Sequence, residues 1–346
     1  MDGKGIGWED HFESDEVRRT LAEKVGDQQR RVADAKLGGQ VDRGQHQKRV
    51  LAAIGSLTLT DAVPPAMRLG PFAEPFAGLP VACRFSNGQP CPFADTEPDV
   101  RGVALKFFSP KGIESDLLMT NQGGRSHARN AREFMAFADV LTEKIASGAL
   151  SALRELAHEL RDGELSVIDL IDGGTSLVQT TALHHVHSLA TESYWGSVVR
   201  LGDVAFKHSL HPHAETSTQA LVAESGADYL RDDLLVRLGR APVKWRMCVQ
   251  LFADSVSTPV GDASVIWSSD LIDIGVLEIS GVPASDIESQ IDRLAFNPTH
   301  GFEPLGMTHA RGDVYEASAR NRSARGLATV EETRRLLGVG APDDSA

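Results

Sequence analysis

The sequence predicts an α+β fold, with an antiparallel β-sheet or barrel that carries inserted and appended helices. Segments with strand character are grouped along the chain, and the helical segments lie between or after these groups. No alternating strand–helix rhythm favours a parallel sheet, and no linker is long enough to separate two domains. An antiparallel barrel with helices around it is therefore the expected architecture.

Strand character is concentrated in two regions of the chain. The first covers about residues 50 to 110, where apolar runs are separated by turns that contain Pro and Gly. The second begins at residue 243, where Trp245, Met247 and Val249 alternate with polar residues. The expected strand segments are SLTLT (56–60), VACRF (81–85), VRGVALKFF (100–108), VKWRMCVQLFAD (243–254), ASVIW (263–267) and GVLEIS (275–280).

Helical patterns stand at both ends of the chain and in its middle. Apolar residues at a period near four predict a helix over 14–32, and leucines at helical spacing predict another over 131–160. Thr329 and Glu332 form a capping box that starts a last helix ending near Gly338. The glycine-rich stretch DGGTS at 172–176 is expected to be a turn.

These patterns predict three parts in the chain. They are a helical arm over 1–40, a core over 41–325, and a last helix with a disordered tail over 326–346.

Composition limits the possible functions. The 346 residues carry a net charge of −13, which gives no basis for binding nucleic acid or an anionic membrane. No apolar run approaches the roughly 18 residues of a membrane span, and the N-terminus lacks the apolar segment of a signal peptide. The three cysteines are odd in number and lack metal-site spacing, so we expect reduced thiols in a cytoplasmic protein.

Four polar clusters could carry chemistry. Alone, each has an ordinary structural interpretation, such as a polar turn, an arginine on an edge strand or a charged surface helix. In the second cluster Arg84 and Ser86 would point to the same side of a strand, with Phe85 on the other. The clusters are DRGQHQK with Arg43 and His46, CRFSNG with Arg84 and Ser86, DLLMTNQ with Asn121, and GMTHARGDVYEASARNR (306–322).

The last cluster places a tyrosine among arginines. Arg311 lies four residues before Tyr315 and Arg322 seven after it, so all three would share one face of a helix. The stretch is either an ordinary charged surface helix or a place where the phenol is held ionised by a neighbouring cation.

In order and surroundings, these clusters resemble the haem-binding core of the catalase superfamily. The resemblance covers roughly residues 40 to 325, nearly the whole chain, and the lack of a further C-terminal domain is similar to the small, core-only branch. The most specific elements are RGVALKF and the Arg-x-x-x-Tyr pattern with a further Arg seven residues on. The matching landmarks are RFSNG, PDVRGVALKFF, DLLMTNQ, RNAREF, YWGSVVRLGDVAFKHSLHP and LAFNPTHG.

The resemblance implies haem b as the cofactor and assigns its binding residues. Tyr315 would be the axial iron ligand, bound as a phenolate, and Arg311 the cation that keeps it ionised. Three arginines would lie near the haem propionates because Arg binds carboxylates in a bidentate manner, and Phe134 would lie against the haem. The three arginines are Arg43, Arg84 and Arg322.

The resemblance also implies the catalytic residues. His46 would take a proton from peroxide and return it to the departing oxygen, while Asn121 orients the peroxide. Ser86 would hydrogen-bond the other ring nitrogen of His46 and fix its tautomer. The stretch VADAKLGG offers an alternative placement of this landmark with Asp34 in the key position, but RGQHQK keeps both the arginine and the histidine.

The sequence departs from the family pattern after Asn121. The family usually reads Asn-x-Pro-x-Phe-Phe, whereas this chain reads NQGGRSHAR, with Ser126 and His127 where phenylalanines are expected. Gln45 replaces a small aliphatic residue beside the iron. These changes predict a more polar and reshaped pocket that fits a peroxidase or an enzyme acting on a larger organic substrate.

The expected function is that of a haem-dependent oxidoreductase acting on hydrogen peroxide, similar to a catalase or peroxidase. One alternative is conversion of an organic hydroperoxide, since allene oxide synthases share this core and its tyrosine ligation. Another is a haem-binding protein without turnover. We expect a homo-oligomer with a small organic reductant or substrate as a further partner, and neither nucleic acid nor membrane.

The remaining histidines are expected to be structural. His184 and His187 are three residues apart, but they precede the Tyr-Trp landmark in what should be a connection between a helix and a strand. His208, His211 and His213 receive the same interpretation.

Overall fold

The computed structural model describes residues 13–74, 78–109, 114–219 and 221–336. Within these ranges the strands form a closed eight-strand antiparallel barrel, which confirms the predicted α+β class. Strands β1 to β4 follow one another as a meander, β9 pairs with β1, and β8 pairs with both β9 and β7 and so closes the ring. The barrel strands are β1 (Arg49–Leu59), β2 (Gly78–Asn87), β3 (Arg101–Phe108), β4 (Glu114–Thr120), β5 (Tyr194–Gly196), β7 (Val204–Pro212), β8 (Val243–Leu251) and β9 (Leu271–Ile279), and the short β6 (Val199–Leu201) and β10 (Glu303–Pro304) extend the sheet beside β7.

The barrel interior is filled by one hydrophobic core. Val81, Cys83 and Phe85 of β2 point into this core, as do alternate residues of β8. Arg84 and Ser86 consequently point to the outer face of the barrel. The period of two read from the sequence is thus confirmed. Arg84 nevertheless faces neither the barrel interior nor water, because residues 46 and 47 cover it.

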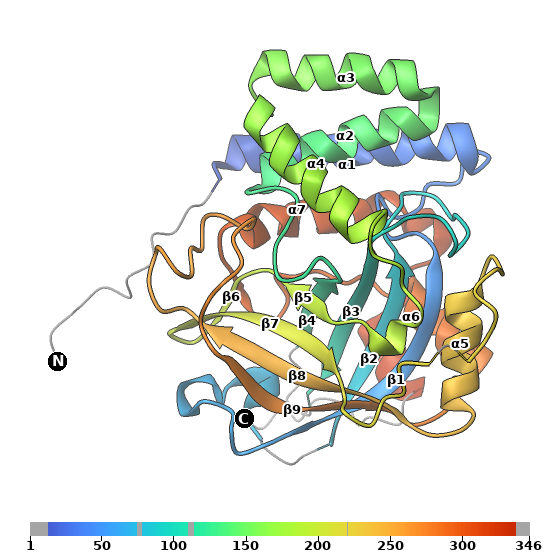
Figure 1. The fold of residues 1–346 in the computed structure, drawn as a ribbon, viewed down its shortest axis with the longest axis vertical. Helices are drawn as coiled ribbons and strands as arrows, with labels where there is room; N and C mark the ends of the chain where they lie inside the picture. The colour runs from blue at the N-terminus through green and yellow to red at the C-terminus, as the bar shows by residue number, and fades with distance from the viewer. Residues whose placement is uncertain (1–12, 75–77, 110–113, 220, 337–346) are drawn as a thin grey trace, which may run out of the picture.

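The helices gather mainly on one side of the barrel (Figure 1). In this view α1, α2 and α3 lie above the barrel, α4 descends towards it, and α7 runs between them and the strands. Helix α1 packs against both α2 and α7. The helices are α1 (Asp15–Lys36), α2 (Ala131–Ser147), α3 (Ala149–Asp162), α4 (Val167–Thr181), α5 (Tyr229–Leu238), α6 (Ser285–Arg293), α7 (Met307–Asn321) and α8 (Val330–Leu336), with 3-10 turns at Pro65–Met67, Gly70–Phe72, Leu189–Thr191 and Ser323–Arg325.

Helix boundaries follow the capping residues. Ser14 accepts a hydrogen bond from the backbone N–H of Val17 at the start of α1, and Thr329 and Glu332 form the expected reciprocal pair before α8. The helix predicted over 131–160 is divided at Gly148, whose φ of 93° interrupts it. The predicted end near Gly338 and the disordered tail lie outside the described residues.

Two local predictions were wrong. Residues 172–176 lie inside α4, because a capping box between Ser166 and Asp169 starts a helix that continues through the two glycines. Residues 263–267 form a turn rather than a strand, because the Asp262 side chain accepts hydrogen bonds from the backbone and hydroxyl of Ser264. Among the described residues, none of the helices is both long enough and apolar enough to cross a membrane.

A buried ion pair fastens the strands to the segment that precedes α7. Lys106 on β3 lies 2.8 Å from the carboxylate of Asp116 on β4, and both side chains are fully buried. Asp116 also accepts a hydrogen bond from the backbone N–H of Asn297 at 2.8 Å. The pair therefore fixes the chain as it approaches α7.

Lys106→Met is expected to lower the free energy of unfolding by about 3–5 kcal/mol, because it leaves the Asp116 charge buried without its cation. Urea denaturation followed by circular dichroism measures the change. Lys244→Met is the matched control, since Lys244 and Glu278 form a pair of which about a third remains exposed on each side, and it should change stability by less than about 1 kcal/mol. Equal effects of the two substitutions would contradict the assigned role of the buried pair.

Candidate functional site

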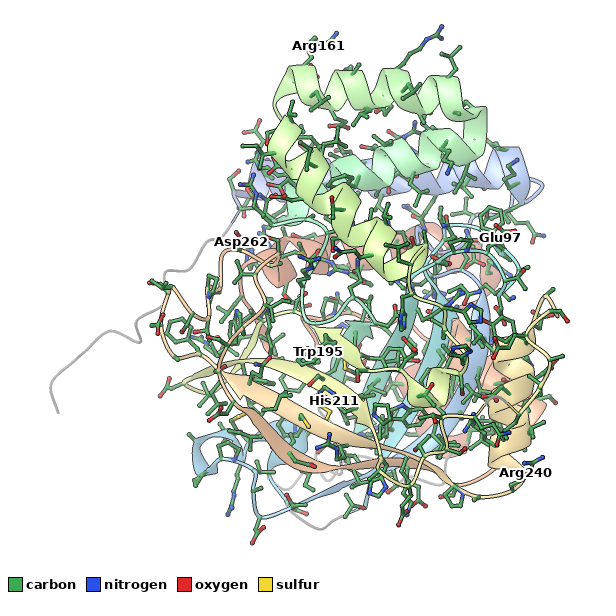
Figure 2. All side chains as sticks on the ribbon, viewed as in Figure 1. Glu97, Arg161, Trp195, His211, Arg240 and Asp262 are labelled. Carbon is green, nitrogen blue, oxygen red and sulfur yellow. The ribbon has the colours of Figure 1, made fainter. Side chains whose placement is uncertain are left out.

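A cavity of about 750 Å³ lies between the outer face of the barrel and the helices that cover it. Strands β2, β3 and β4 supply one wall through residues such as Ser86, Ala104 and Thr120. Helix α2 contributes Phe134, and α7 contributes a further wall. Trp195, whose ring lies 4.9 Å from that of His211, also lines the cavity (Figure 2).

One face of α7 forms its share of the cavity wall. The lining residues recur at intervals of three and four, as the helical period requires, while Ala310 and Ala317 are absent from the lining and pack in the apolar cluster between the helices. Arg311, Tyr315 and Arg322 therefore share one face, as their spacing predicted. The lining positions of α7 and its C-terminal end are Met307, Thr308, Arg311, Val314, Tyr315, Ser318, Ala319 and Arg322.

Arg311 and Tyr315 form a direct pair on this wall. The Arg311 guanidinium donates a hydrogen bond to the Tyr315 hydroxyl oxygen at 2.9 Å. The same guanidinium lies 4.7 Å from the ring centre of Phe134, which holds it in place through a cation–π contact. A permanent positive charge thus stands at the phenol oxygen.

Three arginines meet at the end of the cavity near the C-terminus of α7. Arg84 lies 2.9 Å and Arg43 3.5 Å from Asp292, and Arg322 donates to the carbonyl of Leu294. Burial, together with the charges of Arg84 and Arg322, lowers the pKa of Arg43 well below its usual value. Burial lowers the pKa of Arg322 to about 10. The shifts show that burial costs these two guanidinium groups more than the neighbouring carboxylates return, and a bound anion would offset that cost.

His46 is held in an uncommon backbone conformation. Its φ is 57°, in the left-handed region that few residues other than glycine adopt. The backbone N–H of His46 donates to the Gly88 carbonyl, and Arg84 donates to the carbonyls of His46 and Gln47. These bonds maintain the strained geometry, and strain of this kind occurs often at functional sites.

The His46 imidazole lies in the cavity as a neutral base. Its Nδ1 lies 3.1 Å from the Ser86 hydroxyl oxygen. Burial, followed by the positive charges of Arg84 and Arg311, lowers the pKa of His46 to about 3. The ring is therefore unprotonated near neutral pH and has a free nitrogen with which to accept a proton. Asp34, the alternative placement, is exposed on α1.

Asn121 does not line the cavity. Its amide oxygen accepts from the backbone N–H of Arg101 at 2.8 Å, and its amide nitrogen donates to Glu192 at 2.9 Å. The neighbouring Gln122 lines the cavity instead and makes a 3.2 Å hydrogen bond with Nδ1 of His127. The described structure thus brings together the other predicted site residues but leaves Asn121 behind the cavity wall. The residues brought together are Arg43, His46, Arg84, Ser86, Phe134, Arg311, Tyr315 and Arg322.

His127 gives the cavity a second buried imidazole. Its ring lies 5.3 Å from that of Phe134 and 5.5 Å from that of Phe137. Burial, with a smaller effect of Arg311, lowers the pKa of His127 to about 4, so this ring is also neutral. The departure at NQGGRSHAR therefore places an amide and an imidazole in the cavity wall.

Sequence reasoning missed one buried cation in this wall. Lys207 on β7 donates hydrogen bonds to the carbonyls of Gly124 and Val265 and lies over the ring of Trp267. Burial lowers its pKa to about 8. The sequence signal was a lysine at an alternate position of a strand whose other residues are mostly apolar. Lys207 thus joins the NQGG turn to the loop that follows β8.

The sequence matches no protein-family model, but it is similar to individual known proteins. The chain is 29% identical over 262 residues to a catalase-related peroxidase from Mycolicibacterium paratuberculosis, covering 71% of this chain and 78% of the relative. It is 24% identical over 324 residues to a catalase from an endobacterium of Onchocerca volvulus, covering 84% of this chain and 62% of that protein.

Solved catalases share the fold. A fungal catalase superposes with a TM-score of 0.65 at 18% identity over 81% of this chain, and a bacterial catalase with 0.64 at 21% identity over 91%. The matched regions are 59% and 62% of those two chains, so this protein spans about three fifths of their length. Catalase A from Saccharomyces cerevisiae superposes with a TM-score of 0.64.

The chain is thus similar to a catalase-related peroxidase and a catalase in sequence, and to catalases in fold. In this catalase relative the barrel leaves space for the His46 ring at a glycine. A Cβ atom added at Gly102 would lie 2.6 Å from Cε1 and 2.7 Å from Nδ1 of His46. Gly102 belongs to the RGVALKF motif, so the physical reason for a glycine there is the close approach of the imidazole.

Gly102→Ala is expected to displace the His46 ring from Ser86 and to lower the free energy of unfolding by about 1–3 kcal/mol through overpacking. A crystal structure of the variant tests the displacement, and urea denaturation tests the stability. Gly174→Ala is the control, since a Cβ there meets nothing within 4 Å. An unmoved imidazole in Gly102→Ala would contradict this interpretation.

Proposed function

We propose that this catalase-superfamily protein is a haem-dependent oxidoreductase that acts on hydrogen peroxide as a catalase or peroxidase does. The observation that carries the proposal is that the Arg311–Tyr315 pair and the neutral His46 line the same cavity. The catalase-related peroxidase and catalase relatives support the same class of reaction.

The residues of the cavity fit haem b. Tyr315 would bind the iron, with Arg311 at the phenol oxygen. Arg43, Arg84 and Arg322 would bind the propionates, because three guanidinium groups line one end of the cavity and Arg pairs with carboxylates in a bidentate manner. Apolar side chains such as Phe134 and Leu118 would contact the porphyrin edge. The haem supplies the iron and its redox chemistry when it is bound.

The chain itself supplies proton transfer and orientation. His46 accepts a proton from the peroxide at its free nitrogen and later donates it to the departing oxygen, while Ser86 holds the other nitrogen. The hydrogen bonds from Arg84 to the backbone of residues 46 and 47 fix the position of the ring. Asn121 was predicted to orient the peroxide. Because its amide is bonded to Glu192 and the backbone, we assign it a supporting role and propose Gln122 as the amide in the cavity.

A second candidate is the conversion of an organic hydroperoxide. The observation that favours it is the polar wall formed by Gln122, Ser126 and His127, since phenylalanines were expected at the last two positions. Polar groups in that wall would orient a functionalised organic molecule rather than only a small peroxide. Haem binding without turnover is the remaining alternative, and the assay below distinguishes it.

The cellular compartment, the oligomeric state and the reductant of the enzyme are also proposals. Cys83, Cys91 and Cys248 are unpaired and buried, which supports a reducing compartment such as the cytoplasm. We further propose a homo-oligomer that uses a small organic reductant when it acts as a peroxidase.

Tyr315→Phe is expected to abolish the high-spin ferric absorption bands of protein prepared with haem supplied, because a phenyl ring has no oxygen for the iron. Visible spectroscopy measures the effect. Tyr194→Phe is the matched control, since its hydroxyl donates to the Leu189 carbonyl within the barrel and should leave the spectrum unchanged. A wild-type protein that takes up no haem would overturn the proposal.

His46→Ala is expected to lower peroxide consumption by about 10²–10⁴-fold, the usual contribution of a general acid–base, while haem content remains that of the wild type. Oxygen evolution from hydrogen peroxide and loss of an organic hydroperoxide are followed in parallel. A faster reaction with the organic hydroperoxide would select the second candidate. If the wild type consumes neither substrate faster than His46→Ala, the protein binds haem without turnover.

A further inference from the structure

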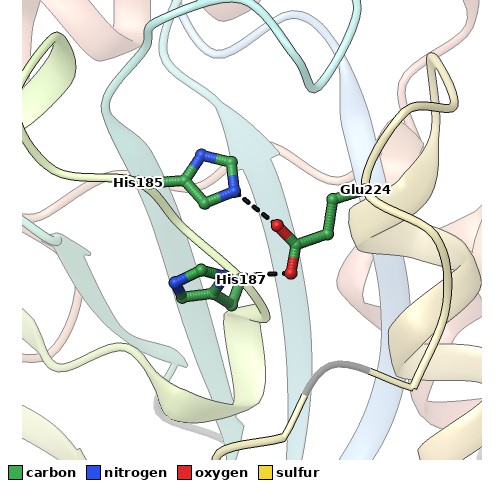
Figure 3. A group of neighbouring side chains, drawn as sticks. All are labelled: His185, His187 and Glu224. Atoms are coloured by element: carbon green, nitrogen blue, oxygen red, sulfur yellow. Dashed lines mark hydrogen bonds and ion pairs between the residues drawn. The ribbon is translucent and has the colours of Figure 1, made fainter.

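Two histidines and a glutamate meet on the surface away from the cavity lining (Figure 3). His185 and His187 lie on the extended connection between α4 and β5, and Glu224 lies on the connection that precedes α5. In extended backbone, alternate residues point to the same side. Val186 between the two histidines is buried, so both imidazoles point outward towards Glu224.

The three side chains already converge without a metal. Nε2 of His185 lies 2.6 Å from one oxygen of Glu224, and Nδ1 of His187 lies 2.9 Å from the other. The potential ligand atoms all lie within 4.8 Å of one another. Bonds of about 2.0–2.2 Å to a central ion place neighbouring ligand atoms roughly 3.3–3.6 Å apart, so each nitrogen would move away from the carboxylate oxygens by no more than about 1 Å.

We propose that the His185–His187–Glu224 cluster binds a divalent transition-metal ion of the zinc type. Two imidazoles and one carboxylate are a common ligand set for Zn²⁺, whereas Mg²⁺ and Ca²⁺ prefer oxygen ligands. About half of each imidazole is exposed, with side-chain accessibilities of 55% for His185 and 58% for His187. Water therefore completes the coordination sphere.

The charge around the cluster favours a cation. Among the described residues, the ion pairs of Glu224 are only those with the two imidazoles, and neither Lys nor Arg lies within 4 Å of its carboxylate. A second group of carboxylates, formed by Asp139, Glu155 and Glu159, differs because a lysine lies beside it. Lys24 lies 3.1 Å from Asp139 and 3.3 Å from Glu159, so a cation of the protein already occupies that group.

The ring of His185 is further restrained by the fold. It stacks on Tyr229 with the two planes 12° apart, and the Tyr229 hydroxyl donates to the Val186 carbonyl at 2.5 Å. The His185 ring and the backbone between the two histidines are thus already ordered before a metal binds. Such preorganisation reduces the entropic cost of binding.

Metal binding would join two connections that lead towards the cavity wall. The segment with His185 continues to Glu192, which accepts the hydrogen bond from Asn121 and also contacts His184 at 2.8 Å. The ion would therefore tie the connection before α5 to the segment that holds Asn121. Its binding energy would appear as added stability of the folded protein.

The test uses full-length, tag-free protein stripped of metal with a chelator. Isothermal titration with Zn²⁺ is expected to show one saturable site, and Co²⁺ should give visible absorption typical of nitrogen and oxygen ligands. Glu224→Gln and His187→Gln should each weaken binding at least tenfold and remove the rise in melting temperature that Zn²⁺ causes in the wild type. These exposed substitutions should leave the circular dichroism spectrum unchanged.

His158→Gln is the matched control, because His158 is a half-exposed histidine that lies 3.3 Å from the single carboxylate of Asp162 on α3. It should retain wild-type affinity for Zn²⁺. Absence of a saturable site in the wild type, or equal affinity in Glu224→Gln and the wild type, would overturn the proposal. The measurement does not depend on haem, so its outcome is separate from that of the proposed enzymatic function.

Discussion

The structure around the cavity depends on the burial of one cation, Arg84. Its guanidinium joins the outer face of the barrel to α6 through Asp292 and to the chain before β1 through the carbonyls of His46 and Gln47. A buried guanidinium must have all its donors satisfied, so it dictates where these three segments lie. The left-handed backbone at His46 is held by this side chain, because the carbonyls of His46 and of the next residue, Gln47, both accept hydrogen bonds from it.

Charge is distributed unevenly in this protein. The chain carries a net charge of −13, yet arginines gather at one end of the cavity and around Tyr315. Burial in such positive surroundings keeps His46 neutral and so available as a base. The same arrangement that would bind carboxylates thus also prepares the acid–base group. If the proposed function is correct, cofactor binding and proton transfer depend on one electrostatic environment.

Much of the fold and of this site was predictable from the sequence, for specific reasons. The alternation in β2 placed Arg84 and Ser86 on one side, and the spacing of Arg311, Tyr315 and Arg322 placed them on one face of α7. The two wrong predictions of local structure concerned segments that are decided by capping and turn contacts. Gly173 lies in α4, which a capping box starts, and Ser264 lies in a turn bonded to Asp262. Closure of the barrel by β7 and β8 pairs distant segments, and no local pattern encodes that pairing. The hydrogen bond between Asn121 and Glu192 could not be predicted from a local pattern either, because the two residues are 71 positions apart in the chain.

Asn121 and Gln122 are adjacent amides with different surroundings, one behind the cavity wall and the other in it. A buried amide keeps its position only if its donors and acceptors are satisfied, and Arg101 and Glu192 satisfy those of Asn121 outside the cavity. The glycines that follow, Gly123 and Gly124, adopt positive φ angles of 68° and 87° and turn the chain sharply. That turn brings Gln122 and His127 together in the wall, with Lys207 bonded to the Gly124 carbonyl behind it. One short turn therefore places a hydrogen-bonded amide and imidazole in the wall, and a difference in reaction from catalases would arise from this turn rather than from the Tyr315 wall.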